Sequence, residues 1–290
     1  MAVRIARFAG EFAQLAVWTG EPEEQLRADE DYQAGEREHW LAWDGDLIVG
    51  ALHPWRGPDG RHRLYYDRCR ADAYQPLAGA IAGECYATAD AADGEALGAL
   101  VQAGFAVNRR ENEYEIPVAR VAAPVPDGIR IITANATDLE PLMLLDCAVR
   151  ADIPGSEGWR PDAAWFREET YDSPFFDPQT YCVALAGDDY VGLARIWMRT
   201  PSTARYCRLG CVGVLAAYRQ QGLGRALIAR AMDPLADRGE ELVTAEADAT
   251  NLASHALLTG FGGRVTGGTV ELLRQAAAPG PAERSHRSRS

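Results

Sequence analysis

The stretch VGVLAAYRQQGLGRALIARAM, from Val212 to Met232, decides the fold. Its first residues end an apolar run typical of a β-strand, and apolar residues recur at helical spacing after Gly224. Between them, Gly222 and Gly224 predict a tight turn whose missing Cβ atoms leave the backbone open to a ligand. The N–H groups of such a turn and the positive end of the following helix face the same point. We therefore expect an anion there, with phosphate as the natural ligand.

Two common phosphate loops are excluded by the residues around this turn. A dinucleotide fingerprint needs a third glycine three residues after Gly224, where this chain has Leu227. A Walker loop needs a lysine, and all 29 basic residues of this chain are arginines. The absence of lysine also excludes Schiff-base chemistry through a lysine side chain.

The charge distribution points to the same stretch. The chain has a net charge of −13, yet no Asp or Glu occurs from Tyr190 to Met232, where seven arginines lie. One interpretation is a site for a small polyanion, and the other is a solvated basic face. Nucleic acid is disfavoured as a partner because the acidic remainder of the surface would repel it.

Composition excludes several classes of protein. The 290 residues are 47% hydrophobic and 24% charged, which is typical of a globular protein. Neither an apolar run of 18 residues nor a secretory signal occurs, so we expect a cytoplasmic protein without a membrane partner. The six cysteines form no CxxC pair and are expected to be buried reduced thiols, with Cys207 and Cys211 on one strand face. The histidines form no HxH or HExxH pattern, so no metal site is predicted.

Two short stretches occur twice, in the same order. GDLIVG at 45–50 matches GDDYVG at 187–192, and ADAADGEALGALVQAGF at 89–105 matches ADATNLASHALLTGF at 247–261. We infer two copies of one unit, each well over 100 residues long. Between the two repeats the second copy is 16 residues longer, and this extra length contains the glycine turn. The first copy is therefore predicted to be a degenerate scaffold without the turn.

The predicted domain organisation follows from the duplication. It comprises a degenerate copy at 1–118, a Pro/Ala-rich linker at 119–127, a ligand-binding copy at 128–275 and a disordered tail at 276–290. The predicted fold class is α+β, with two tandem domains, each a mostly antiparallel twisted sheet flanked by helices. In the second copy we expect Asp138 to cap one helix, Pro161 to open the next, and Pro234 to bend or shorten the helix after the turn.

Together these residues resemble the GNAT acyltransferase superfamily. Its V-x-V strand is followed by [QR]-x-x-G-x-[GA], which here reads Val212-Gly213-Val214 and then Arg219 to Gly224. A second family element, N-x-x-[AS]-x-x-L ending in G-F, reads Asn251, Ser254 and Leu257 before Gly260-Phe261. The resemblance covers roughly residues 128–275, whereas the first copy is similar only in the order of its elements.

The resemblance implies a site for acetyl-CoA as cosubstrate. The backbone amides of the turn would bind its diphosphate, the splayed strand would pair with its pantetheine arm, and Asn251 and Ser254 would line its thiol end. The arginine excess fits this ligand, because coenzyme A carries about four negative charges. The cofactor-binding residues implied are Cys211, Val212, Val214, Arg219, Gln220, Gln221, Gly222, Leu223, Gly224, Arg225, Asn251 and Ser254.

The catalytic residues are less well defined by the sequence. The resemblance makes the Val214 N–H the donor to the thioester carbonyl. Many family members carry a tyrosine as general acid where this chain has Leu258. Tyr206 and Tyr218 are the alternatives as general acid. A thiol of pKa about 8.5 can also leave as a thiolate without any general acid. Glu246, on one strand face with Asp248, is the candidate base; the alternatives are that Glu246 pairs with a neighbouring arginine or that water relays the proton.

Three residues are candidates for the acceptor wall, namely Asp152, Trp159 and Trp197, with core packing as the alternative for both tryptophans. The predicted function is transfer of an acetyl group to a primary amine of a small cationic molecule, in a ternary complex and by a monomer or homodimer. Three alternatives remain open: a non-catalytic acyl-CoA sensor, a thiol-capping tandem acetyltransferase like those of actinobacteria, and a transferase that uses aminoacyl-tRNA.

Overall fold

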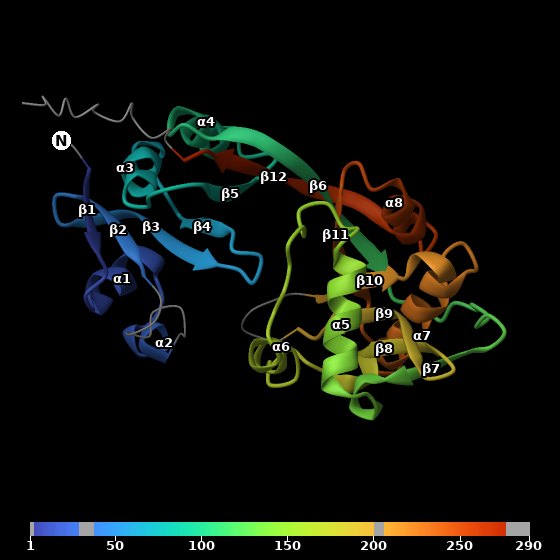
Figure 1. Ribbon diagram of the computed structural model, residues 1–290. Coiled ribbons are helices and arrows are strands. Elements are labelled where there is room, and N and C mark those ends of the chain that lie inside the picture. Colours follow the sequence, from blue (N-terminus) through green and yellow to red (C-terminus); the bar gives the residue numbers. More distant parts are fainter. Residues whose placement is uncertain (1–2, 29–37, 200–205, 277–290) are drawn as a thin grey trace, which may run out of the picture.

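Twelve strands form one continuous sheet within residues 3–28, 38–199 and 206–276, which a computed structural model describes. Its strand order is β1-β2-β3-β4-β5-β12-β6-β11-β10-β9-β8-β7 (Figure 1). The elements of the first half are β1 Arg4–Arg7, α1 Phe12–Thr19, α2 Glu23–Ala28, β2 Trp40–Asp44, β3 Leu47–Arg56, β4 His62–Asp67, α3 Tyr74–Gly79, β5 Cys85–Asp90, α4 Gly94–Gln102 and β6 Ala106–Pro117.

The second half repeats this order of elements. They are β7 Ile129–Thr133, α5 Leu139–Arg150, α6 Ala163–Thr170, β8 Tyr181–Ala186, β9 Asp189–Trp197, β10 Cys207–Val214, α7 Leu223–Asp237, β11 Leu242–Asp248, α8 Leu252–Thr259 and β12 Arg264–Arg274. The repeated GD stretches form the equivalent hairpins β2–β3 and β8–β9. The repeated ADA stretches lead from β5 into α4 and from β11 into α8. The duplication inferred from the sequence is thus confirmed.

The halves are joined by an exchange of their last strands. β12, from the second half, lies between β5 and β6, with Val270 opposite Ala89 on one side and Arg110 on the other. β6, from the first half, lies between β12 and β11, with Ile116 opposite Val243. The two sheets that the sequence predicts are therefore fused, and β6 and β12 arch across the top of the molecule in Figure 1.

Strand pairing in the described chain is antiparallel except at β4–β5 and β10–β11. Each parallel pair is connected through a helix, α3 in the first half and α7 in the second, because a parallel pair needs a crossover connection. α3 has six residues and α7 has fifteen. The longer second copy predicted from the repeats thus corresponds to a longer crossover helix and its preceding turn.

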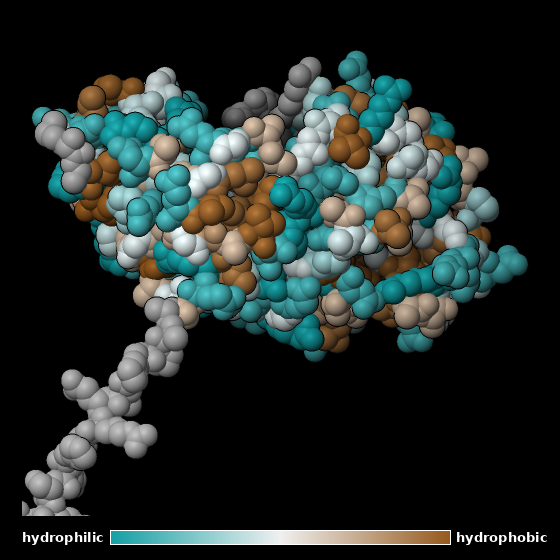
Figure 2. Space-filling model, turned by 90° about the horizontal axis from the view of Figure 1, so that it is seen from above, coloured by the Kyte–Doolittle hydropathy of each residue, from teal (hydrophilic) through white to brown (hydrophobic). Residues whose placement is uncertain are grey.

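Each half of the sheet is covered on both faces. In the second half, α7 and β10 enclose one core around Leu227 and Met232, and α5 and α6 enclose another around Leu142 and Phe166. The first half has the same two layers, with α3 and α4 on one face and α1 and α2 on the other. Seen from above, hydrophilic residues cover most of the surface, and one group of hydrophobic residues lies near its middle (Figure 2).

A β-bulge corrects the expected placement of two cysteines. The register of β10 against β9 shifts between Leu209 and Cys211. Cys207 therefore packs in the α7 core, while Cys211 packs in the α5 core on the opposite face. All six cysteines are free thiols; Cys69 and Cys147 are only partly buried.

Three expectations about helix ends need correction. Asp138 is the N-cap residue of α5, but its side chain accepts no capping hydrogen bond. Pro161 precedes α6, whose cap is Asp162, because the Asp162 side chain accepts a hydrogen bond from the Trp165 N–H at 2.9 Å. Pro234 lies inside α7 and does not shorten it, because the helix continues to Asp237; the bend expected there stays a prediction. No helix or strand occurs between β6 and β7, and the predicted tail lies outside the described residues from 277 onward.

Candidate functional site

The turn before α7 adopts the conformation that its glycines predicted. Gly222 is the N-cap residue of α7 with φ of 83°, and Gln220 also has a positive φ, of 59°. Two left-handed positions so close together fold the backbone tightly and turn its N–H groups towards the start of α7. The first turn of α7 contains no acidic residue. The positive end of a fifteen-residue helix is therefore open to an anion.

Arg219 fixes this turn to its surroundings. Its Nε donates a hydrogen bond to the Val214 carbonyl at 2.8 Å, which ties the turn to the end of β10. Its Nη2 forms an ion pair with Asp152, in the connection between α5 and α6. The sequence predicted both residues for the site, and the structure brings them together.

A cavity of about 590 Å³ opens beside the turn. It is bounded by the end of β10, the turn, the first residues of α7, the start of α8 and the end of α5. The predicted residues in its wall are Asp152, Val212, Val214, Arg219, Gln220, Gly222, Leu223, Gly224, Arg225, Asn251 and Ser254. Five predicted residues, Cys211, Gln221, Glu246, Trp159 and Trp197, are not part of that wall.

The strand beside the cavity is splayed from its neighbour. β10 pairs with β11 only from Cys207 to Leu209, whereas it pairs with β9 as far as Val214. The edge of β10 from Cys211 to Val214 is therefore not paired with β11, and its N–H and C=O groups are open to an extended ligand. The Cys211 side chain takes no part, because it is buried in the α5 core, where burial raises the pKa of its thiol.

The start of α8 forms the far end of the cavity. Asn251 is the N-cap residue of α8, and its Oδ1 accepts a hydrogen bond from the Ser254 N–H at 3.1 Å. The cap therefore fixes both predicted residues in the wall. Leu258, which occupies the position of the family's tyrosine, is buried in the α7 core. Tyr218, one of the two alternatives as acid, lines the cavity.

Glu246 lies where β10 and β11 separate. It follows Ala245, the last residue of β11 that pairs with β10. Its carboxylate forms an ion pair with Arg208, as the alternative interpretation had it. Glu113 of β6 lies opposite Glu246 and was not predicted. Burial, and then the carboxylates of Glu246, Asp90 and Glu111, raise the pKa of Glu113. Only the exchange of β6 brings Glu113 here, and no local sequence pattern shows that exchange.

The two tryptophans of the predicted acceptor wall are packed against neighbouring groups. A Cβ at Gly210 would collide with the indole of Trp197, so this ring lies across β10 at the bulge. The Arg195 guanidinium lies 4.3 Å from the Trp197 ring centroid. Trp159 packs edge-on against Trp165, at 5.5 Å between centroids, and under Arg150. Neither tryptophan reaches the 590 Å³ cavity.

The basic stretch is more dispersed than its composition suggested. Of the six arginines between 190 and 232 that the structure describes, only Arg219 and Arg225 line the cavity. Arg225 donates to the Gly260 carbonyl at 3.0 Å and covers the ring of Phe261. Arg199, Arg208 and Arg230 form ion pairs with acidic residues outside the stretch, while Arg195 is buried.

Several cavity residues were not among the predicted site residues, because they are small or apolar. They are Val149, Ile153, Gly213, Ala253, Ala256 and Leu257. Gly213 lies inside the V-x-V pattern, and a Cβ there would collide with Val149 of α5. Because α5 packs so close to β10, the middle position of the V-x-V pattern must be glycine. Within the described residues there is no group of three or more potential metal ligands, and no helix is long and apolar enough to cross a membrane.

Comparisons with known proteins agree with this geometry. Residues 150–262 match the model of the acetyltransferase (GNAT) family. A mycothiol acetyltransferase from Beutenbergia cavernae is 30% identical over 142 residues, which are 48% of this chain and 46% of that relative. The alignment thus covers about half the length of each protein.

Two solved structures share the fold across almost the whole chain. A GCN5-related N-acetyltransferase from Sphaerobacter thermophilus has a TM-score of 0.68 at 18% identity, covering 94% of this chain and 95% of that one. A tandem GNAT protein from the clavulanic acid biosynthesis pathway has a TM-score of 0.64 at 14% identity, covering 96% and 99%. The fold is therefore that of a tandem α+β acyltransferase scaffold. Residues 150–262 thus match the GNAT family, and the chain as a whole has the fold of a tandem GNAT protein.

Proposed function

We propose that the second half binds acetyl-CoA and transfers its acetyl group to a primary amine of a small cationic molecule. The observation that carries the proposal is the left-handed glycine turn at the N-terminus of α7, which opens onto a cavity bordered by the unpaired edge of β10. A diphosphate and an extended pantetheine arm are complementary to these two features.

Each part of acetyl-CoA has a matching part of the cavity. The amides from Gln220 to Arg225 would hold the diphosphate, with the guanidiniums of Arg219 and Arg225 nearby. The pantetheine arm would pair along Cys211–Val214 as an added strand. Asn251 and Ser254 would contact its thiol end. Gln221 is placed at the turn by its sequence position, with its side chain directed to the Ala217 carbonyl at 3.4 Å.

In the proposed reaction the amine nitrogen attacks the thioester carbon, the C–N bond forms and the C–S bond breaks. The Val214 N–H would stabilise the oxyanion that forms, and an amide donor of this kind contributes about 10²–10³ in rate. The proton lost by the amine would go to Glu246, at the point where the strands separate. Coenzyme A would leave as a thiolate, or with a proton from Tyr218, which lines the cavity.

The acceptor would approach from the side of Asp152, Trp159 and Trp197. The net charge of −13 favours a cationic acceptor, such as a polyamine or an aminosugar. Acetyl transfer of the kind performed by a mycothiol acetyltransferase is the second candidate function, because the aligned relative carries that name. A cytoplasmic monomer or homodimer without nucleic acid partners fits either function. Binding of acetyl-CoA without turnover on any acceptor would instead indicate a sensor.

Calorimetric titration with acetyl-CoA tests the proposal, and the chain offers a matched control. Gly222 and Gly239 lie at opposite ends of α7, both have φ near 80°, and neither has an atom within 4 Å of a built Cβ. Gly222→Asp and Gly239→Asp therefore impose similar backbone strain, but only the first places a carboxylate at the diphosphate.

We expect micromolar binding by the unmodified chain and by Gly239→Asp, and a loss of at least about tenfold, or about 1.4 kcal/mol, for Gly222→Asp. Equal binding by all three proteins, or no binding by any of them, would refute the coenzyme A site. Titration of the released thiol during incubation with spermidine or glucosamine then separates an enzyme from a sensor.

A further inference from the structure

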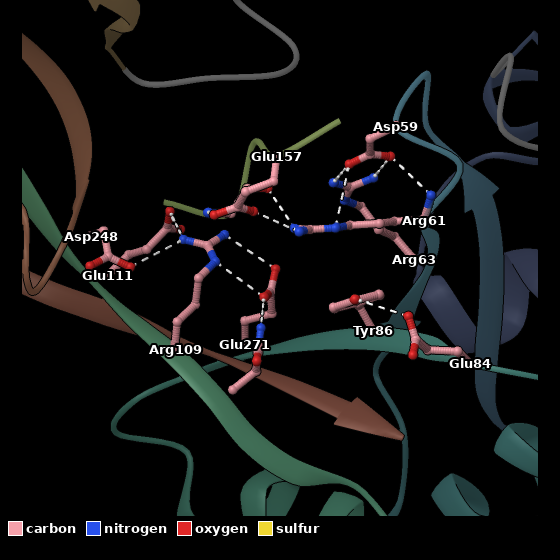
Figure 3. Close-up of polar contacts among 12 residues, drawn as sticks. Asp59, Arg61, Arg63, Glu84, Tyr86, Arg109, Glu111, Glu157, Asp248 and Glu271 are labelled. Carbon is pink, nitrogen blue, oxygen red and sulfur yellow. Dashed lines mark hydrogen bonds and ion pairs between the residues drawn. The ribbon is translucent and has the colours of Figure 1, made fainter. Parts of the chain in front are cut away.

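A second cavity, of about 680 Å³, lies between the two halves of the chain. The first half supplies Arg61, Tyr86 and Arg109 to its wall, and the second half supplies Gly155 and Glu157. Figure 3 shows the side chains of Arg61 and Arg109 on either side of Glu157. The cavity thus has walls from both domains, unlike the 590 Å³ cavity, whose wall comes from the second half alone.

The segment between α5 and α6 separates the two cavities. Ile153 lines the first cavity and the next residue, Pro154, lines the second. Likewise, Asn251 lines the first cavity and the residue before it, Thr250, lines the second. We refer to residues 152–158 as the partition loop. Its position determines the shape of the space that an acceptor would enter beside the proposed coenzyme A site.

Arg61 of the first half holds the partition loop. Its Nη1 donates to the Gly155 carbonyl at 2.7 Å, and its Nη2 donates to the Glu157 carboxylate at 2.6 Å. Burial alone would raise the pKa of Glu157, but hydrogen bonds from its own backbone N–H, from the Gly155 N–H and from Arg61 outweigh it and lower that pKa. Glu157 is therefore ionised at neutral pH and gives a charge-assisted bond.

Arg61 is itself held rigidly. Asp59, in the same β3–β4 connection, accepts a hydrogen bond from the Arg61 N–H at 3.0 Å. The Asp59 side chain is fully buried and also accepts both Nη groups of Arg63, at 2.9 and 2.5 Å. The Arg61 guanidinium lies 5.0 Å from the ring centroid of Tyr86. A guanidinium that already lies against an aromatic ring, on a backbone fixed by Asp59, loses little further entropy when it holds a loop.

A second arginine of the first half supports the same loop. Gly155 has a φ of 86°, and a Cβ there would collide with the guanidinium of Arg109. Arg109 is anchored by Glu271 of β12 at 3.1 and 3.2 Å and by Glu111 at 2.5 Å. The partition loop thus packs on side chains of the exchanged strands. Figure 3 shows two of them, Arg109 of β6 and Glu271 of β12, in contact with each other.

We propose that Arg61 is a positioning residue for the acceptor, and that the first domain serves the second by fixing the partition loop through it. The proposal rests on the acetyl transfer proposed above. Arg61 touches neither the 590 Å³ cavity nor the α7 turn. Its two bonds go to Gly155 and Glu157, while Asp152 keeps its ion pair with Arg219 of the turn. Loss of Arg61 therefore affects acceptor binding and leaves acetyl-CoA binding intact.

The test uses the full chain and three variants. Arg61→Ala removes both bonds to the loop, and Arg61→Lys keeps the charge but cannot donate in two directions with the same geometry. Arg70→Ala is the matched control, because Arg70 forms ion pairs with Asp44 and Asp72, both within the first half. Hydrogen exchange of peptides covering 151–160 reports the loop directly, and calorimetry with acetyl-CoA reports the other site.

We expect Arg61→Ala to speed exchange in the partition loop about tenfold, the effect of losing charge-assisted hydrogen bonds, with a smaller change for Arg61→Lys and none for Arg70→Ala. The Kd for acetyl-CoA should change less than about twofold, while the KM for the amine probe, spermidine or glucosamine, rises about tenfold. Unchanged exchange in Arg61→Ala would overturn the proposal, as would a loosened loop with an unchanged KM.

These measurements also separate this proposal from the proposed function. If the unmodified chain acetylates neither probe, the predicted acceptor class fails, and the exchange data alone then decide whether Arg61 holds the loop. If Arg61→Ala weakens acetyl-CoA binding as much as it weakens acceptor binding, Arg61 stabilises the whole domain and the positioning role is wrong.

Discussion

Glu246 lies in a suitable position for a general base, but its carboxylate already forms an ion pair with Arg208. It is the first residue of β11 beyond the pairing with β10, so it lies where the two strands separate, outside the wall of the 590 Å³ cavity. Its ion pair with Arg208 holds the side chain on the strand face shared with Asp248 and Glu113. An ion pair does not prevent a carboxylate from accepting a proton, since its second oxygen still has free lone pairs.

At the residue scale we predict that Glu246→Gln lowers kcat about 10²-fold while the Kd for acetyl-CoA stays unchanged, because a general base contributes at least that factor. The matched control is Glu115→Gln, on the same face of the neighbouring strand β6 and opposite Thr244. Initial rates with an accepted amine measure both variants. Equal rates for Glu246→Gln and the unmodified chain would show that water or the amine's own equilibrium removes the proton.

At the scale of elements, the β3–β4 hairpin depends on one buried carboxylate. Asp59 neutralises Arg63 and fixes the backbone of Arg61, and no part of its side chain is exposed. Burial would raise its pKa, but hydrogen bonds from Arg63 and the Arg61 N–H, together with both guanidinium charges, lower it. Removing one member of a buried pair costs about 3–5 kcal/mol, because the other charge is left without a partner.

We therefore predict that Asp59→Asn lowers the free energy of unfolding by about 3 kcal/mol at pH 7. Because the folded pKa of Asp59 is below its ordinary value of 3.8, this contribution is present above pH 3.8 and is lost as the pH falls through the folded pKa. Urea unfolding at several pH values measures it. A difference between the two proteins that stays constant below pH 3.8 would contradict the assignment to the ionised carboxylate.

The sequence was informative where structure is local and uninformative where contacts are distant. The turn at Gly222 follows from adjacent residues, and the duplication follows from short repeats with a fixed order. The bulge in β10 was missed because strand alternation assumes an unbroken register, which placed Cys207 and Cys211 on one face. The bonds from Arg61 to the partition loop span more than 90 residues, and no periodic pattern specifies such a partner.

At the scale of the molecule, the exchanged strands make each core depend on both halves. Tyr114 and Ile116 of β6 are buried in the α7 core of the second half. Val270 and Leu272 of β12 are buried in the first-half core beside α3 and α4. The exchange of β6 and β12 thus ties together two domains whose connecting segment has no regular structure.

The exchange predicts that neither half folds alone. A fragment of residues 119–290 lacks β6, so β11 and β12 lose their common neighbour and the α7 core loses two buried side chains. Burial of two such side chains is worth about 3–6 kcal/mol, a large part of the 5–15 kcal/mol that stabilises a typical domain.

We expect this fragment and residues 1–118 to lack cooperative unfolding by circular dichroism when expressed separately, and to copurify as a folded complex when coexpressed. The pair should bind acetyl-CoA as the intact chain does. If residues 119–290 alone unfold cooperatively and bind acetyl-CoA with full affinity, the second domain is autonomous, and the exchanged strands are a connection between domains rather than a requirement for folding.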